Sequence, residues 1–267
     1  MSLELLAAAQ VAARAASKLL QTARPEAIRD KTNIKDLVTE WDVRSEELIR
    51  TVLEEHAPGI PVLGEEAGQG AGAASGLRWL VDPIDGTVNF AHGLPIWCVS
   101  IAVEDRGTLL AGVVVAPALG WWFEASRGGG AHDGTGLPIH VSATAQLDRA
   151  LLASGFPYDL ATSPDNNYAE WGHLQKTARA CRRLGAAALD LCCVARGWFD
   201  GYWERKVKPW DVGAGALIVL EAGGTVTDTQ GGGFDPHAGE VVATNGAIHD
   251  GLIAELGRVR TGLVETS

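Results

Sequence analysis

Hydrophobic and polar positions in the first half of the chain follow two different periods. Residues 1–23 repeat apolar side chains at helical spacing, which predicts an amphipathic N-terminal helix. A second helix is predicted over residues 43–56, with Asp42 at its cap position and a Pro-Gly pair closing it. Short apolar runs predict strands at residues 60–66 and 77–83, a loop rich in small residues at 67–76, and an antiparallel meander with glycine turns at 97–134.

From about residue 137 the pattern changes to alternating strand-like and helical segments. This alternation predicts an α/β half, after an α+β half that contains the meander. We expect an N-terminal half at residues 1–136 and a C-terminal half at 137–267, which form one compact unit around a shared cleft. The predicted elements of the second half are strands at 150–156 and 199–204, a polar loop at 157–167, and helices at 168–180, 187–195 and 212–222.

Composition limits the classes of function. With 267 residues, of which 46% are hydrophobic and 21% charged, the chain can bury a substantial core. The formal charge of −11 and the absence of Lys/Arg runs argue against binding to nucleic acid or to an anionic membrane. No apolar run is long enough to cross a membrane and the N-terminus lacks a basic start, so we expect a soluble cytoplasmic protein. The four cysteines lack C-x-x-C spacing and are predicted to be reduced, buried thiols.

The segment WLVDPIDGTVNF, residues 79–90, contains the first candidate chemistry. Asp82 and Asp85 flank a Pro-Ile pair at the end of a buried strand, where their charge must be solvated, protonated or neutralised. A bound cation would neutralise both carboxylates, and Gly86 would let backbone amides approach an anion. Taken alone, the segment also fits an ordinary strand-to-helix turn in which an aspartate acts as a cap.

Two further acidic sites lie where a regular element ends or begins. Glu65 and Glu66 follow a predicted strand, and Asp211 directly precedes a helix rich in small residues. Asp211 alone reads as a plain N-cap. Together these acids form a set of oxygen ligands without histidine or cysteine partners, because the histidines are scattered without ligand spacing. Such a set selects Mg²⁺ or Mn²⁺ over zinc.

In this order and with these separations, GEE, WLVDPIDGTVNF and KPWDVGAGALIVLEAGG resemble motifs of the inositol monophosphatase family of magnesium-dependent phosphatases. The resemblance covers nearly the whole chain and includes KTNIKDLVTEWD, SGFPYD and RRLGAAALDLCCVARGWFDGYWE. It implies a mixed α+β and α/β fold, the layered α/β/α/β/α sandwich of the inositol monophosphatase/fructose-1,6-bisphosphatase type. It also implies a homodimer. Trp97, Trp121 and Trp122 are then candidates either for the subunit interface or for ordinary core packing.

The resemblance implies two to three bound metal ions, with Mg²⁺ expected and Mn²⁺ as an alternative. One ion would bind Glu65, Asp82 and the backbone carbonyl of Ile84. A second ion would bind Asp82, Asp85 and Asp211, so that Asp82 bridges the two. A third, weaker ion would lie near Glu65.

The same resemblance implies roles in catalysis and substrate binding. Glu65 and Thr87 would orient and deprotonate a water, and Asp42 would bind the Thr87 hydroxyl. Lys31 would lie on a loop beside the metals. Ala186 replaces the Ser or Thr that many members have, so a hydroxyl contact is lost there. The implied substrate-binding residues are Asp85, Gly86, Thr87, Gly185, Ala187, Glu204 and Asp211.

The expected function is a Mg²⁺-dependent phosphomonoesterase that hydrolyses inositol monophosphate, a small phosphorylated polyol, by metal-activated water. Histidinol-phosphate phosphatase is the main alternative, followed by fructose-1,6-bisphosphate and adenosine 3′,5′-bisphosphate phosphatases. A regulatory protein-binding role is an alternative of another class. Glu204 would bind substrate hydroxyls, although it also fits a solvated charge at a strand end. Inhibition by lithium is expected from the resemblance.

Overall fold

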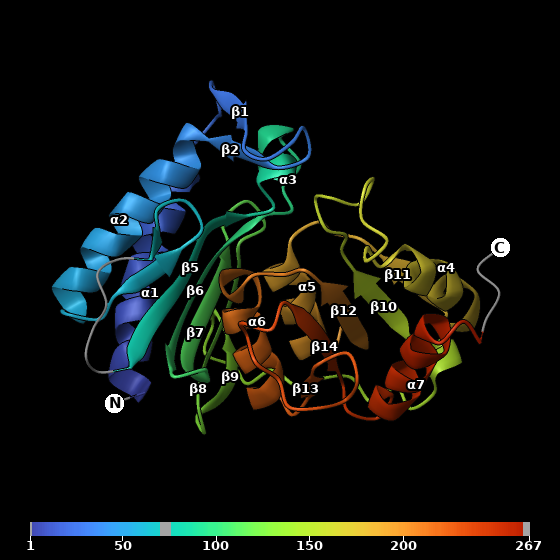
Figure 1. The fold of residues 1–267 in the computed structure, drawn as a ribbon. Coiled ribbons are helices and arrows are strands. Elements are labelled where there is room, and N and C mark those ends of the chain that lie inside the picture. The colour runs from blue at the N-terminus through green and yellow to red at the C-terminus, as the bar shows by residue number, and fades with distance from the viewer. Residues whose placement is uncertain (1, 70–75, 264–267) are drawn as a thin grey trace.

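The structure is a computed structural model that describes residues 2–69 and 76–263. Figure 1 shows helices and sheets stacked in alternate layers: α1 and α2, one sheet, α5 and α6, a second sheet, and α4 with α7. This arrangement confirms the layered α/β/α/β/α fold class. Most of the loop expected at residues 67–76 lies outside the described residues. Among the described helices none is long and apolar enough to cross a bilayer.

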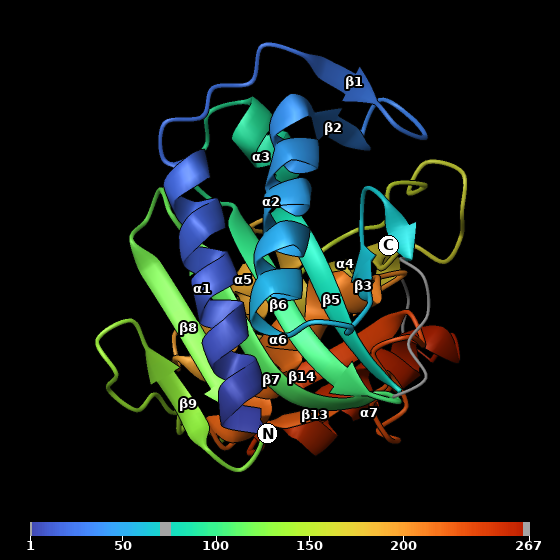
Figure 2. The ribbon, with the colours of Figure 1, turned by 90° about the vertical axis from the view of Figure 1, so that its left-hand side faces the viewer.

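The first sheet has seven strands in the order β4-β3-β5-β6-β7-β8-β9. Strands β6 to β9 form the predicted antiparallel meander, and β5 pairs antiparallel with β6. Helices α1 (Ser2–Leu20) and α2 (Glu40–His56) lie side by side over one face of the sheet (Figure 2). The buried side of α1 is mostly alanine, so this helix packs closely on the sheet. The strands are β3 (Val62–Gly64), β4 (Gly68–Gln69), β5 (Leu77–Asp85), β6 (Cys98–Asp105), β7 (Thr108–Ala116), β8 (Trp121–Ser126) and β9 (Gly130–Asp133).

The middle layer consists of α5 (Ala187–Ala195) and α6 (Pro209–Glu221), which pack against each other. Both helices are apolar on almost every side, as expected for helices buried between two sheets. Cys98, Cys192 and Cys193 belong to the core around them, and all four cysteines are free and buried, as predicted.

The second sheet has five strands in the order β11-β10-β12-β14-β13. Strand β10 is parallel to β11 and β12, whereas β14 is antiparallel to β12 and β13. Helices α4 (Tyr168–Thr177) and α7 (His249–Arg260) cover its outer face (Figure 1). The strands are β10 (Leu151–Ser154), β11 (Ala180–Arg182), β12 (Gly201–Arg205), β13 (Thr225–Thr227) and β14 (Glu240–Thr244). Outside both sheets lie the hairpin β1 (Ile28–Asp30) and β2 (Leu37–Thr39) and the short helix α3 (Thr87–Ala91).

Three predicted boundaries were wrong, and each has a local cause. Helix α2 begins at Glu40 because Thr39 is its N-cap and accepts from the Trp41 amide, so Asp42 is not the cap. Helix α6 begins at Pro209, and Asp211 therefore lies inside its first turn. Helix α4 ends at Thr177, since residues 180–182 pair with β10. The proposed division at residue 136 stays a prediction.

Candidate active site

A cavity of about 730 Å³ opens between the two sheets, at the start of α3, α5 and α6. Its volume suits a small-molecule ligand. Asp42 is the one predicted site residue that does not line the cavity, because it lies behind Thr87. The predicted residues that do line it are Lys31, Glu65, Asp82, Ile84, Asp85, Gly86, Thr87, Gly185, Ala187, Glu204 and Asp211.

The turn at residues 82–86, called the elbow here, contains Asp82 and Asp85. A β-bulge places both aspartates on the cavity. In β5, Asp82 pairs with Ser100 and Asp85 pairs with Cys98, so two residues of β5 oppose one of β6. Without this bulge, residues three apart on a strand would point to opposite faces. One oxygen of Asp82 accepts from the Ile84 amide at 3.0 Å.

Asp85 joins the elbow to the middle layer. Its two carboxylate oxygens accept from the amides of Ala187 at 3.1 Å and Ala188 at 2.7 Å, in the first turn of α5. The N-cap residue of this helix, Ala186, has no side-chain oxygen, and Asp85 supplies the missing acceptor from a distant part of the chain. Ala187 was expected to contact substrate through its backbone, and its amide is bonded to Asp85.

Gly86 connects β5 to α3 through a tight left-handed turn. Its φ of 90° is unfavourable for any other residue, and an added Cβ would lie 3.1 Å from the carbonyl oxygens of Gly185 and Ile96. The side chain of Asn89 donates to the carbonyls of Ile96 and Leu184, which holds α3 against the same segments. The glycine therefore permits the close approach of three chain segments at the floor of the cavity.

Thr87 and Asp42 form a hydrogen-bonded pair beneath the cavity. The Thr87 hydroxyl donates to Asp42 Oδ1 at 3.0 Å, and Asp42 Oδ2 accepts from the hydroxyl and amide of Thr39. Burial raises the pKa of Asp42 to about 6, with a further increase from the charge of Glu65, although the bonds from Thr39 and Thr87 oppose it. The contact between Thr87 and Asp42 is the one that the family resemblance implied.

Lys31 reaches from the β1–β2 hairpin to the GEE motif. Its ammonium group lies 2.8 Å from Glu65 and 2.5 Å from Glu66. Burial would lower the pKa of Lys31, but the charges of both glutamates outweigh it and raise the pKa. Burial raises the pKa of Glu66 to about 7. Glu66 is one of the acids proposed from the sequence as oxygen ligands, but the resemblance gave it no role; in the structure it pairs with Lys31.

Sequence reasoning also missed Glu46, which orients the GEE motif. Glu46 is buried on α2 and accepts from the amides of Glu66 at 2.8 Å and Ala67 at 3.0 Å. Arg50, one turn later on the same helix, pairs with it. An acid on the buried side of an amphipathic helix, with an arginine four residues later, was the available signal.

Four acids crowd one another on this side of the cavity. Burial raises the pKa of Asp82 and Asp211 well above the ordinary aspartate range, and the charges of Glu65 and Asp85 raise both further. Burial also raises the pKa of Asp85 to about 7, although the amide of Ala188 opposes this increase. Burial and repulsion therefore disfavour the charged forms of Asp82, Asp85 and Asp211 unless a cation compensates their charge.

The chemistry of these donors fits Mg²⁺, since they are carboxylate oxygens in a crowded, buried and negatively charged site. Asp211 Oδ2 accepts from the Lys208 amide at 2.7 Å, and Asp82 and Asp85 also accept backbone amides, as described above. Within residues 2–69 and 76–263, no three His, Cys, Asp or Glu side chains lie close enough together to coordinate one metal ion as they stand. The amide bonds and the Lys31 ion pair hold the carboxylates in this arrangement.

The opposite wall of the cavity contains Glu204, at the end of β12. Its carboxylate accepts from the Tyr202 hydroxyl, and burial raises its pKa to about 7. A Cβ at position 155 would collide with this carboxylate, which explains Gly155 in SGFPYD. Glu204 is thus a half-buried cavity residue and not a solvated strand end. Asp190 of α5, which sequence reasoning missed, lines the same cavity.

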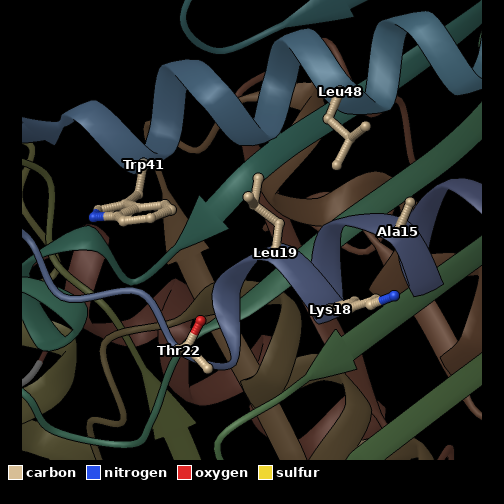
Figure 3. Close-up of a pocket in the computed structure, with 6 residues that line it drawn as sticks. All are labelled: Ala15, Lys18, Leu19, Thr22, Trp41 and Leu48. Carbon is tan, nitrogen blue, oxygen red and sulfur yellow. The ribbon is translucent and has the colours of Figure 1, made fainter.

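A second, more open hollow lies between α1 and α2 (Figure 3). Leu19 and Leu48 face each other across it, and Lys18 is the single charged residue of its lining. Its chemistry contrasts with that of the acidic cavity. The remaining lining residues are Ala15, Thr22 and Trp41.

The tryptophans have different environments. Trp97 is buried and packs edge-on against Phe90 at 5.0 Å, which agrees with core packing. Trp121 lies 4.7 Å from the ring of Trp198, which is 44% exposed. The indole of Trp122 donates to Glu124. An interface at these residues stays a prediction.

Comparison with known proteins agrees with this geometry. The model of the inositol monophosphatase family matches residues 2–261. An inositol-1-monophosphatase from Synechocystis sp. is 43% identical over 84% of this chain and 78% of that protein. A putative Nus factor SuhB from Neisseria meningitidis serogroup B is 41% identical over 88% of this chain and 90% of that protein. The structure of inositol monophosphatase from Anabaena (Nostoc) sp. superposes with a TM-score of 0.87 at 40% identity, covering 95% of each chain.

Proposed function

The chain belongs to the inositol monophosphatase family, and on this premise we propose that it is a Mg²⁺-dependent phosphomonoesterase that hydrolyses an inositol monophosphate to inositol and phosphate. The observation that supports the proposal most directly is the cavity shared by the acids of the elbow, the GEE motif and α6. Their raised pKa values reflect charge that a divalent cation would compensate.

The proposed metal ligands are Glu65, Asp82, the carbonyl oxygen of Ile84, Asp85 and Asp211. When bound, Mg²⁺ supplies positive charge for the phosphoryl group and lowers the pKa of a bound water. Lys31, paired with Glu65 and Glu66, adds a positive charge beside the same acids.

The remaining steps use the chain's own groups. Because the Thr87 hydroxyl donates its hydrogen to Asp42, the Thr87 oxygen can accept a hydrogen bond from an attacking water. Glu65 would help to orient this water and remove its proton. The amides of Gly86 and Thr87, at the start of α3, would bind phosphate oxygens. Glu204 would accept hydrogen bonds from hydroxyl groups of the leaving polyol.

A substrate panel tests this proposal. Phosphate release is measured with Mg²⁺ on inositol 1-phosphate, histidinol phosphate, fructose 1,6-bisphosphate and adenosine 3′,5′-bisphosphate. We expect the highest kcat/KM on inositol 1-phosphate, complete loss with EDTA, recovery with Mg²⁺ or Mn²⁺, and inhibition by lithium. Activity that persists in EDTA would contradict the metal mechanism, and a preference for histidinol phosphate would transfer the assignment to that substrate.

A regulatory role is a second candidate, because a relative with 41% identity has the name putative Nus factor SuhB. The two roles are compatible, and an inactive variant separates them. In a strain that lacks this protein, rescue by Asp82→Asn at wild-type level would support a regulatory protein partner. Failure of the folded variant to rescue would support the phosphatase.

We also propose a cytoplasmic homodimer, whose mass in solution can be measured by light scattering.

A further inference from the structure

Asp190 is a buried acid on the cavity wall without a hydrogen-bond partner for one of its oxygens. It lies in the first turn of α5, is 1% exposed and lines the cavity. Among the described residues, nothing bonds to its Oδ1 atom. An unpaired buried carboxyl oxygen costs free energy, so such groups are uncommon unless a ligand or water completes them.

The helix dipole favours an acid in the first turn of α5, but it gives no hydrogen-bond partner to Asp190 Oδ1 among the described residues. The first-turn amides of Ala187 and Ala188 already bond to Asp85. The residues four before and four after Asp190 are Ala186 and Val194, so no helical ion pair is possible at that spacing. Contacts within the helix therefore leave this oxygen unpaired, and the cavity that Asp190 lines is where a ligand could complete it.

The surroundings of Asp190 place it with the leaving-group wall. Glu204 is the charge that most strongly raises the pKa of Asp190 after burial itself, followed by Asp85, while Arg183 opposes them. Helix α5 packs against β12, the strand that ends at Glu204 (Figure 1). Asp190 and Glu204 therefore form a pair of neighbouring carboxyl groups on that wall, with Arg183 beside them.

We propose that Asp190 determines specificity by contacting the leaving group directly: it donates a hydrogen bond to one hydroxyl oxygen while Glu204 accepts one from a neighbouring hydroxyl. The inference rests on the proposed function and extends it. Each hydroxyl of a polyol both donates and accepts, so one donor and one acceptor side by side match two adjacent hydroxyls. The ammonium group of an amine substrate such as histidinol phosphate, in contrast, only donates hydrogen bonds and therefore needs acceptors alone. Burial keeps the pKa of Asp190 well above its usual range, which favours the protonated form that can donate.

The test compares two Mg²⁺-loaded variants, Asp190→Ala and Asp190→Asn, on inositol 1-phosphate and on 4-nitrophenyl phosphate, which has no hydroxyl groups. We expect Asp190→Ala to lower kcat/KM for inositol 1-phosphate about tenfold, mainly through KM, as for the loss of one hydrogen bond. Activity on the aryl phosphate should stay within about twofold. Asp190→Asn retains a donor and should stay within about threefold of wild type on both substrates.

A matched control is Cys193→Ala, which shortens another buried side chain of α5 that does not line the cavity. It should leave the ratio of the two activities unchanged. Equal losses on both substrates in Asp190→Ala, or no loss on either, would overturn the inference by assigning Asp190 to packing alone. A loss in Asp190→Asn as large as in Asp190→Ala would overturn its role as a donor. Wild-type protein that cleaves neither substrate would instead contradict the proposed function.

Discussion

The two acidic walls of the cavity differ in how their charge is arranged. On one wall, Asp82, Asp85 and Asp211 accept backbone amides and raise one another's pKa. On the other wall, Glu204 bonds to a tyrosine hydroxyl, and no group in the described part of the chain bonds to Asp190 Oδ1. Arg183 lies close enough to act on the charge of both acids. Several close carboxylates favour a bound cation, whereas burial lets a smaller pair remain partly protonated and bind neutral hydroxyls, although Arg183 opposes this. The crowding of the acids, more than their number along the sequence, therefore separates the two proposed roles.

The largest expected effect comes from the crowded wall. Asp82→Asn removes a charge that both proposed ions share, so kcat/KM should fall by about 10³-fold or more on both inositol 1-phosphate and 4-nitrophenyl phosphate. Asp133→Asn is the control, because Asp133 ends a strand of the same sheet and also accepts a backbone amide, but lies outside the cavity. Near-normal turnover by Asp82→Asn would contradict the metal role of Asp82 and leave the elbow as a structural turn only.

An intermediate effect is expected on the leaving-group wall. Glu204→Gln retains the shape of the side chain but loses charge-assisted hydrogen bonds, so kcat/KM for inositol 1-phosphate should fall 10- to 100-fold, about 1.4–3 kcal/mol. Steady-state kinetics on 4-nitrophenyl phosphate should show little change. If kcat/KM falls equally for both substrates, Glu204 supports the site in general, and the proposed separation of a metal wall from a leaving-group wall is wrong.

The smallest expected effect is thermodynamic and depends on pH. The folded-state pKa of Asp85 is about 7, above its unfolded value, so its protonated form stabilises the metal-free fold below about pH 4 and that stability is lost as pH rises towards 7. Asp82 and Asp211 shift in the same direction. Mg²⁺ competes with these protons. Saturating Mg²⁺ should therefore raise Tm by about 5 °C at pH 8 and by clearly less at pH 5.5.

Differential scanning calorimetry with Mg²⁺ and with EDTA at both pH values measures this shift. Ca²⁺-free buffers and a constant ionic strength serve as controls. A shift that is equal at the two pH values, or larger at pH 5.5, would contradict a site made of these carboxylates.

Local patterns predicted most elements because regular structure repeats at short range. The predicted helix at residues 187–195 matches α5, and the predicted meander matches β6 to β9. Boundaries failed at Asp42 and Asp211 for one shared reason. Both acids occupy the third helical position and bond back to the amide that opens the helix, a geometry that resembles an N-cap in sequence.

The sequence alone determined which acids are available, the order of the motifs and the family they resemble. Only the tertiary structure decided how these groups meet. It added the bulge that turns Asp82 and Asp85 to one side, and the bonds from Asp85 to α5. It also revealed the unpaired oxygen of Asp190. Periodicity reports contacts within a few residues, whereas Asp85 and Ala188 are 103 positions apart, and the fold alone sets the burial and repulsion that give such groups their chemistry.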